Sequence, residues 1–264
     1  MKNVHLPEFL RYLLSGQAYT VDRVGLSDSK VLIFEDKVLK IRSCTEETKT
    51  EFQMLQWLQG KIPVPQVLYH KIDQNADYLL MTKIEGDMAC SETLMGDPVR
   101  LTRQLADALK LMWGVDISDC PSNWSLDRKL IAAEAAVTTR AVDLDDFEPE
   151  IFGEYGFSGS KDLLVWLLNN RPSEELVLSH GDFCLPNIFF QGDCLSGMID
   201  LGRAGIADRW QDIALCYRSL KHNYSGKYGG KVYDNYNPDL FFDALGVEPD
   251  LEKLKYYILL DELF

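Results

Sequence analysis

Residues 1–84 carry short runs of β-forming residues separated by turn-forming ones. The runs predict strands, at residues 18–24, 30–34, 38–42, 66–72 and 78–82. One helix is expected at residues 45–58, because Thr45 can cap its start and Leu55 and Leu58 continue an apolar face at helical spacing. Asn75 lies between the last two runs and predicts a hairpin there. We therefore predict an antiparallel sheet with one helix.

Residues 85–264 change to longer helical patterns. Apolar residues recur every three to four positions in the segments 97–115, 126–139, 161–168, 209–220, 238–245 and 251–263. The outline is an α+β protein of two lobes joined by a short connector. We expect a β-rich lobe at residues 1–84 and a mainly helical lobe at residues 85–264.

Residues 176–200 differ from the rest of the second lobe, because an apolar strand is followed there by a hairpin with its turn at residues 191–193. Asn187 and Asp200 are symmetric about a turn centre near Asp193 and Cys194, so the hairpin should bring them side by side. An amide oxygen and a carboxylate form a good partial shell for Mg²⁺. Asp182 can orient a hydroxyl that attacks a γ-phosphate, or accept its proton. A surface loop with incidental acids is the alternative, which the spacing disfavours.

Two charged residues of the first lobe fit the same chemistry. Lys40 lies inside an apolar strand and can bind the α- and β-phosphates of a nucleotide. Glu51 shares a helix face with Leu55 and can pair with Lys40, although an outward-facing lysine and a solvated glutamate are the competing interpretations. The loop at residues 25–29 can offer N–H groups and the Ser27 hydroxyl to phosphate. Its single glycine makes that signal weak.

The formal net charge of −14 limits the classes of molecule that the protein is expected to bind. An acidic surface repels nucleic acid and anionic membranes and attracts cationic ligands, although many proteins are acidic for solubility alone. The position of the acids is more informative: six lie within residues 141–160, and Asp261 and Glu262 lie in the last four residues. No long apolar run predicts a membrane span. The six cysteines contain no CxxC pair, which favours a reduced, cytoplasmic protein without a zinc site.

Several motifs together resemble the aminoglycoside phosphotransferases, and especially the 3'-phosphotransferases of the type III group. The similarity runs nearly end to end. It is carried by Gly60-Lys61-Ile62-Pro63-Val64-Pro65, Asp116-Ile117-Ser118-Asp119-Cys120-Pro121, His180-Gly181-Asp182, Asn187-Ile188-Phe189, Ile199-Asp200-Leu201-Gly202-Arg203 and Lys255-Tyr256-Tyr257-Ile258-Leu259-Leu260-Asp261-Glu262-Leu263-Phe264. His-Gly-Asp alone occurs in many small-molecule kinases, whereas the second and the last of these segments are far more specific.

The resemblance implies a bilobal protein-kinase-like fold that uses ATP and Mg²⁺ to phosphorylate an aminoglycoside, conferring antibiotic resistance. It implies that the first lobe binds nucleotide, and that the second binds substrate and carries the catalytic residue. The implied catalytic residue is Asp182, with Asn187 and Asp200 as metal ligands and Asp212 bracing the catalytic loop. The implied nucleotide contacts are the phosphate-binding pair Lys40 and Glu51, Ser27 at the β-phosphate, and the backbone of Thr82 and Ile84 at adenine. The residues implied at the substrate are Asp143, Glu150, Asp182, Arg203, Asp261, Glu262 and the carboxylate of Phe264.

The chain departs from the type III pattern at several positions. Val38 replaces an adenine-stacking aromatic, so nucleotide preference is left open between ATP and GTP. His222 stands where an acid contacts the drug, Phe147 replaces an acid of the substrate loop, and residues 223–236 form an insertion.

Two other functions fit the same motifs. One is a kinase of another small hydroxylated metabolite, of the choline, methylthiosugar or homoserine type. The other is a non-catalytic binding protein that retains the fold. Two separate acid clusters favour a polycationic substrate over a monocation, and the complete set of motif residues disfavours a non-catalytic protein.

Overall fold

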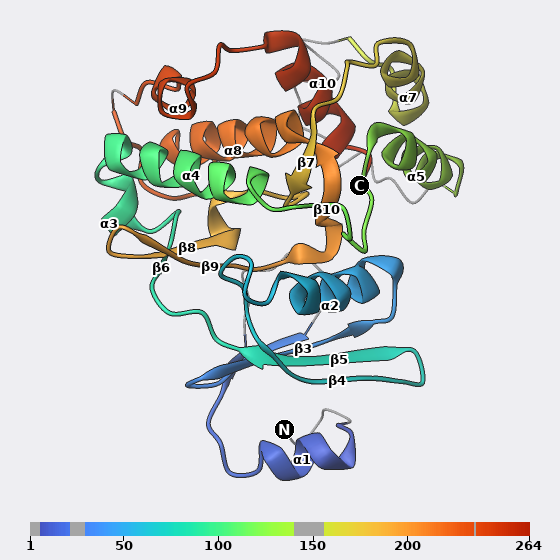
Figure 1. Ribbon diagram of the computed structural model, residues 1–264, viewed down its shortest axis with the longest axis vertical. Coiled ribbons are helices and arrows are strands. Elements are labelled where there is room, and N and C mark those ends of the chain that lie inside the picture. The colour runs from blue at the N-terminus through green and yellow to red at the C-terminus, as the bar shows by residue number, and fades with distance from the viewer. Residues whose placement is uncertain (1–5, 22–29, 140–155, 235) are drawn as a thin grey trace.

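The computed structural model describes residues 6–21, 30–139, 156–234 and 236–264. The chain forms two lobes stacked along the long axis of the molecule (Figure 1). One lobe holds a five-stranded antiparallel sheet with the helices α1 and α2, and the other is mainly helical. The α+β prediction is therefore confirmed, while the boundary between residues 84 and 85 stays a prediction.

The sheet of the smaller lobe has the strand order β1-β2-β3-β5-β4. Its strands are β1 (Thr20–Val21), β2 (Lys30–Ile33), β3 (Lys37–Ser43), β4 (Val67–Asp73) and β5 (Ala76–Thr82). The predicted hairpin joins β4 to β5 through Gln74 and Asn75, whose φ angles of 51° and 79° are left-handed. Two successive left-handed residues match the twist of the paired strands. The short turn therefore sets the register of β4 against β5.

Helix α2 (Glu46–Leu58) begins where the sequence predicts. Thr45 and Thr48 form a reciprocal cap, in which each backbone N–H donates to the hydroxyl of the other residue, at 3.0 and 3.2 Å. The helix lies between the sheet and the larger lobe (Figure 1). It buries Glu51 together with Leu55 and Leu58, so a charged residue shares the face that meets the core.

A second helix, α1 (Glu8–Leu13), adds to the one helix that the sequence predicts in this lobe. It lies on the side of the sheet opposite α2 (Figure 1). Leu6, Leu10 and Leu14 are buried in one cluster with Leu32 and other residues of the sheet. Their spacing of four residues is the signal that predicts this helix.

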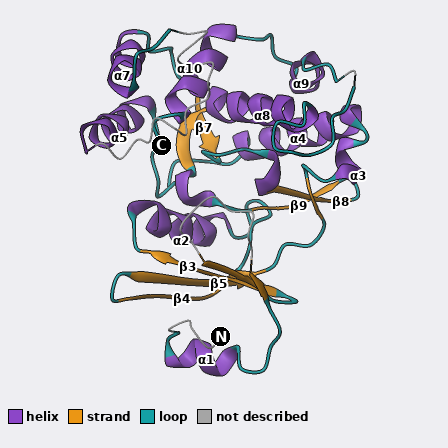
Figure 2. Cartoon of the chain, turned by 180° about the vertical axis from the view of Figure 1, so that it is seen from behind, coloured by secondary structure: helices purple, strands orange, loops and turns teal. Residues whose placement is uncertain are grey.

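The larger lobe is built mostly from helices, as expected. They are α3 (Glu92–Met95), α4 (Pro98–Trp113), α5 (Leu126–Thr139), α7 (Ser160–Asn169), α8 (Arg209–Tyr224), α9 (Asp239–Leu245) and α10 (Leu251–Asp261). Helix α8 packs against α10, and α4 packs against α9 (Figure 2). Among the described residues, no helix combines the length and apolar character that a membrane crossing requires.

Two small antiparallel sheets lie in this lobe on the side that faces α2 (Figure 1). One pairs β7 (Leu176–Ser179) with β10 (Gly205–Asp208). The other has the order β6-β8-β9, with β6 (Asp87–Met88), β8 (Ile188–Gln191) and β9 (Cys194–Met198). Residues 180–187 and 199–204, which carry the predicted metal and catalytic residues, are the ends and connections of these strands.

Candidate active site

The segment His180–Asp182 follows β7 and is held by groups from α8. Asp212 accepts hydrogen bonds from the backbone N–H groups of His180 at 2.8 Å and Gly181 at 3.0 Å. Gly181 has a φ of 84°, and a side chain there would collide with the carbonyl of Arg203. Burial raises the pKa of Asp212, although the hydrogen bonds to this carboxyl lower it. The brace that the resemblance implies is therefore present in the geometry.

Asn187 lies beside Asp182. Its side-chain nitrogen Nδ2 donates to the Oδ2 atom of Asp182 at 2.9 Å and to the Asp182 carbonyl at 3.0 Å. Both donor hydrogens of the amide are thereby used, and the amide oxygen is left to face another group. The sequence places these two residues five positions apart, and the short 3₁₀ turn Leu185–Asn187 brings them into contact.

The β8–β9 hairpin brings Asn187 near Asp200, with one difference from the predicted symmetry. The N–H of Ile199 donates to the Asn187 carbonyl at 3.0 Å, so Asn187 lies opposite Ile199 and not opposite Asp200. The register shifts between Phe189 and Phe190, which is a β-bulge. Asp200 follows with a left-handed φ of 61°, which turns the chain out of the strand. The turn closes between Gly192 and Asp193, one residue before the predicted centre, and the bulge offsets part of that shift, so Asn187 is one residue out of the predicted register.

Lys40 of β3 joins the two lobes electrostatically. Its ammonium Nζ lies 2.7 Å from the Oε1 atom of Glu51 and forms a second ion pair with Asp200. Burial lowers the pKa of Lys40, but Glu51 and Asp200 outweigh it and hold that pKa above its ordinary value. Conversely, Lys40 holds the pKa of Asp200 below its ordinary value, although partial desolvation of this carboxylate acts in the opposite direction. The predicted pairing of Lys40 with Glu51 is confirmed.

Sequence reasoning missed the residues that hold Glu51 from the other side. Arg42 pairs with Glu51, and its Nε donates to the Oδ2 atom of the buried Asp77 at 3.2 Å. The second carboxylate oxygen of Asp77 lies 2.6 Å from the Nε2 atom of His70. Arg42 lies two residues after Lys40 on the same strand, so strand alternation puts both on one face. That spacing is the signal that identifies Arg42.

The predicted nucleotide contacts are described only in part. Ser27 lies outside the described residues. The N–H of Thr82 donates to the Gln66 carbonyl at 2.9 Å, so the carbonyl of Thr82 is the group available to a base. The side chain of Ile84 packs against Gly197, where an added Cβ would lie 2.6 Å from Ile84 Cδ1. Ile84 therefore packs against the hairpin of the larger lobe.

Of the acidic residues predicted to bind the substrate, apart from Asp182, the structure describes only Asp261 and Glu262, near the end of the chain. Asp143 and Glu150 lie outside the described residues. Asp261 and Glu262, in the acidic turn (residues 261–264), both pair with Arg218 of α8, Glu262 at 3.2 Å. The side chain of Glu262 is 6% exposed and that of Asp261 is 18% exposed. Sequence reasoning placed these acids at the substrate and missed Arg218, which is distant in sequence.

Arg203 links the acidic turn to α2. Its Nε lies 3.0 Å from the Oε1 atom of Glu47, and its Nη1 lies 3.8 Å from the Oδ1 atom of Asp261. Its guanidinium carbon also lies 5.6 Å from the centroid of the Phe264 ring. Arg203, Asp261 and Phe264, all predicted at the substrate, are thus brought together, and Arg203 already has two carboxylate partners.

Comparisons with known proteins agree with this geometry. The chain matches the model of the phosphotransferase enzyme family over residues 19–251. It is 37% identical to an aminoglycoside 3'-phosphotransferase of Enterococcus faecalis over 276 positions, which cover 100% of each chain. The chain belongs to the aminoglycoside 3'-phosphotransferase family.

Two solved structures show the same fold. The aminoglycoside phosphotransferase APH(3'')-Id from Streptomyces rimosus aligns with a TM-score of 0.80 and 24% identity over 96% of this chain and 95% of that chain. An aminoglycoside-3'-phosphotransferase of type VIII aligns with a TM-score of 0.75 and 26% identity over 97% of each chain. The chain therefore has the protein-kinase-like fold of its family, and it is a phosphotransferase.

The positions where the chain departs from the type III pattern have structural partners of their own. The ring of His222 lies 3.0 Å from the hydroxyl of Tyr228, through its Nδ1 atom. Within the insertion, Tyr236 stacks on Tyr224 with 3.9 Å between ring centroids, and the Tyr224 hydroxyl donates to the Met95 carbonyl at 3.2 Å. The described part of the insertion therefore packs on the end of α8. Phe147 lies outside the described residues.

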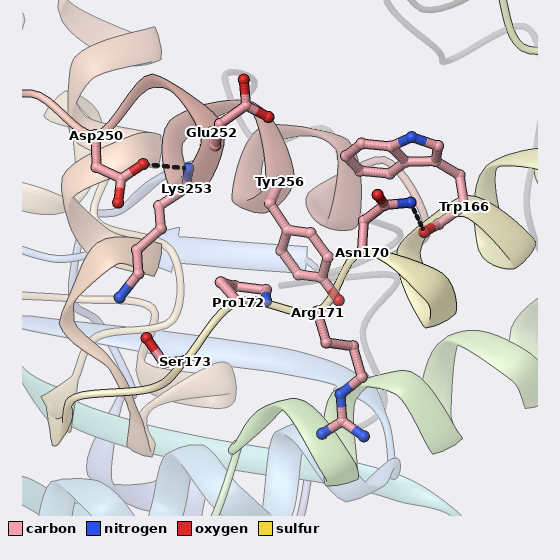
Figure 3. A pocket seen from close by; sticks show the side chains of 9 residues that line it. All are labelled: Trp166, Asn170, Arg171, Pro172, Ser173, Asp250, Glu252, Lys253 and Tyr256. Carbon is pink, nitrogen blue, oxygen red and sulfur yellow. Dashed lines mark hydrogen bonds between the residues drawn. The ribbon is translucent and has the colours of Figure 1, made fainter.

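A pocket of about 400 Å³ lies away from these residues, between α7 and α10 (Figure 3). Trp166 of α7 and Asn170, just after that helix, line one side, and Glu252 and Tyr256 of α10 line the other. Figure 3 shows Arg171 extending from the pocket toward α5, where it pairs with Asp127 at 2.5 Å. None of the predicted site residues that the structure describes lines this pocket. It is therefore separate from the candidate active site.

Proposed function

We propose that this chain transfers the γ-phosphoryl group of ATP to the 3'-hydroxyl of aminoglycosides of the kanamycin and neomycin type, and so confers resistance. The connected charges of Glu51, Lys40 and Asp200, next to the bonded pair Asp182 and Asn187, carry the phosphoryl-transfer part of the proposal. The names of full-length relatives carry the choice of aminoglycosides. The proposed site for both substrates lies between the two lobes.

The donor set fits a magnesium ion. Asn187 keeps its amide oxygen after both hydrogens are used by Asp182, and Asp200 offers carboxylate oxygens. Mg²⁺ takes few protein ligands and prefers oxygen, and an ion held there would neutralise charge on the nucleotide phosphates. No cluster of three or more His, Cys, Asp or Glu residues suited to a metal is present in the described ranges, so the two-residue set is the candidate.

Asp182 is placed to position the acceptor hydroxyl. One of its carboxylate oxygens is held by Asn187, so the carboxylate has a defined direction. A sugar hydroxyl that donates to this carboxylate has its oxygen oriented for attack, and its proton has an acceptor. The loop is itself fixed through Asp212, and the main contribution asked of the protein is this positioning.

Lys40 and Glu51 would hold the nucleotide. Glu51 forms ion pairs with both Lys40 and Arg42. The pair with Glu51 keeps the Lys40 ammonium charged and close to Asp200. An ammonium in that position can bind phosphate oxygens as a point charge. Lys40 thereby connects the nucleotide phosphates to the residue proposed to bind the metal.

The proposed product explains resistance in physical terms. Phosphorylation adds an anion to a polycation and removes a hydroxyl donor, which weakens its binding to RNA phosphates. The acidic protein, with a net charge of −14, attracts the polycation and is not expected to bind nucleic acid or an anionic membrane. We propose that it acts in the cytoplasm on a small-molecule substrate.

A substrate panel tests the proposal. The purified chain would be incubated with Mg²⁺ and γ-labelled ATP, and separately GTP, and with aminoglycosides that carry or lack a 3'-hydroxyl. Choline, homoserine and a methylthiosugar would be included. We expect label transfer to the 3'-hydroxyl compounds alone. Transfer to a metabolite but to no aminoglycoside would overturn the substrate assignment, and transfer to none would overturn the whole proposal.

A further inference from the structure

Lys129 is a buried lysine that has no ion pair among the residues that the structure describes. It lies in the first turns of α5 with 4% of its surface exposed. The other lysines buried in the described part of the chain, Lys40 and Lys253, each have a carboxylate within 4.0 Å, whereas Lys129 has none. A buried charge needs partners of some kind, because leaving water costs free energy. Burial accordingly lowers the pKa of Lys129, to about 8.

Aromatic rings take the place of a carboxylate partner. The Lys129 ammonium lies 5.4 Å from the centroid of the Phe264 ring and 5.9 Å from the Trp124 ring. The Phe264 ring meets Trp124 edge-on, with 6.4 Å between centroids and an interplanar angle of 89°. Arg203 lies 5.6 Å from the same Phe264 ring. Two cations and an indole thus surround one phenylalanine.

The phenylalanine belongs to the acidic turn. The N–H of Phe264 donates to the Asp261 carbonyl at 3.2 Å, and the N–H of Leu263 donates to the Leu260 carbonyl at 3.2 Å. Leu263 is buried and anchors the turn from the inside. Holding the Phe264 ring therefore restricts the backbone that carries Asp261 and Glu262. The direction of those carboxylates depends on whether the ring stays in place.

We propose that Lys129 is a positioning residue for aminoglycoside binding, which holds the Phe264 ring and thereby the carboxylates of Asp261 and Glu262. This inference rests on the proposed function for its substrate, but the contact between Lys129 and the acidic turn is independent of it. Lys129 acts through Phe264, so its loss should change substrate affinity and leave the chemical step nearly unaltered.

Kinetics of Lys129→Met test the effect on the substrate. Methionine fits an apolar site of similar size, and we expect KM for the aminoglycoside to rise about fivefold with little change in kcat or in KM for ATP. Lys129→Arg keeps the cation and should remain near wild type. Lys255→Met removes a different lysine that lies over an aromatic ring, Trp166, and serves as the matched control.

A double-mutant cycle tests the route through Phe264. Phe264→Leu removes the ring but keeps an apolar side chain. If Lys129 acts through the ring, Lys129→Met should add little to the effect of Phe264→Leu. Full additivity of the two effects on KM would overturn the proposal.

Hydrogen exchange supplies a readout that needs no substrate. In Lys129→Met, the backbone amides of residues 261–264 should exchange at least about fivefold faster than in wild type, whereas Lys255→Met and Lys129→Arg should leave them unchanged. Unchanged exchange together with unchanged KM would overturn the inference. If wild type phosphorylates no aminoglycoside, the proposed function fails, and the exchange result still decides whether Lys129 holds the acidic turn.

Discussion

The proposed phosphoryl-transfer site (Lys40, Glu51, Asp182, Asn187 and Asp200) and the acidic turn both contain carboxylates, but these carboxylates differ in exposure and in their partners. At the phosphoryl-transfer site, Asp200 is 46% exposed and Asp182 is oriented by a neutral amide, so both can meet incoming ligands. In the acidic turn, Asp261 and Glu262 are largely buried against Arg218. The difference shows that the number of acids in a sequence overstates the charge available to a substrate, because arginines distant in sequence can neutralise them.

The largest expected effect belongs to the phosphoryl-transfer site. Asp182→Ala removes the group that would orient and deprotonate the hydroxyl, and we expect kcat to fall by about a thousandfold or more. Binding of ATP, measured by calorimetry, should remain within about twofold, since Lys40 and Glu51 are untouched. Asp193→Ala, at the closed end of the same hairpin, is the control. A turnover near wild type for Asp182→Ala would show that Asp182 does not carry the chemical step.

A smaller loss of kcat is expected when Asp212, which holds the backbone of the catalytic loop, is removed. Asp212→Ala leaves the buried N–H groups of His180 and Gly181 without their acceptor. The loop should shift, and kcat should fall by about 100-fold. The unfolding temperature should fall as well. Asp212→Asn, which retains one acceptor oxygen, should lose less in both assays; an equal loss would argue against hydrogen bonding as the cause.

The acidic turn should show its own signature in pH dependence. Burial lowers the pKa of Lys129 to about 8, and the charges of Asp261, Arg203, Asp212 and Asp182 act on the same ammonium. The ordinary pKa of a lysine is about 10.4. Between about pH 8 and about pH 10.4 the unfolded chain therefore binds more protons than the folded chain, and the free energy of unfolding rises with pH. From about pH 7.5 to about pH 9.5, the free energy of unfolding of wild type should gain about 2 kcal/mol relative to Lys129→Met. Urea unfolding at both pH values measures this shift, and Lys255→Met should show none.

The smallest effect is expected for the arginine that holds the turn. Arg218→Met removes the guanidinium that pairs with both Asp261 and Glu262, while Asp261 keeps its 3.8 Å contact with Arg203. Because the two carboxylates lose a positioning partner but stay in the turn, we expect KM for the aminoglycoside to rise about three- to fivefold with kcat nearly constant. A fall in KM would mean that Arg218 competes with the substrate and does not position the acids. Steady-state kinetics with a di- and a tetra-amine substrate distinguish the two.

Much of the smaller lobe was predictable because its signals are local. Thr45 caps α2, and Asn75 closes the β4–β5 hairpin, each through contacts within a few residues. The pairing of Lys40 with Glu51 was also predicted, from one apolar strand and one helix face. Helix α1 is absent from the predicted elements, although Leu6, Leu10 and Leu14 carry its pattern.

The residue types and spacing of the proposed phosphoryl-transfer site could be predicted from the sequence, because the chain from Asp182 to Asp200 folds back through one hairpin. The register of Asn187 could not be predicted, because it depends on where the turn closes and on a bulge. The pairing of Asp261 and Glu262 was also hidden from the sequence, because Arg218 approaches them from another helix. Charge compensation depends on distance in space, and local sequence carries no record of that distance for residues more than 40 positions apart.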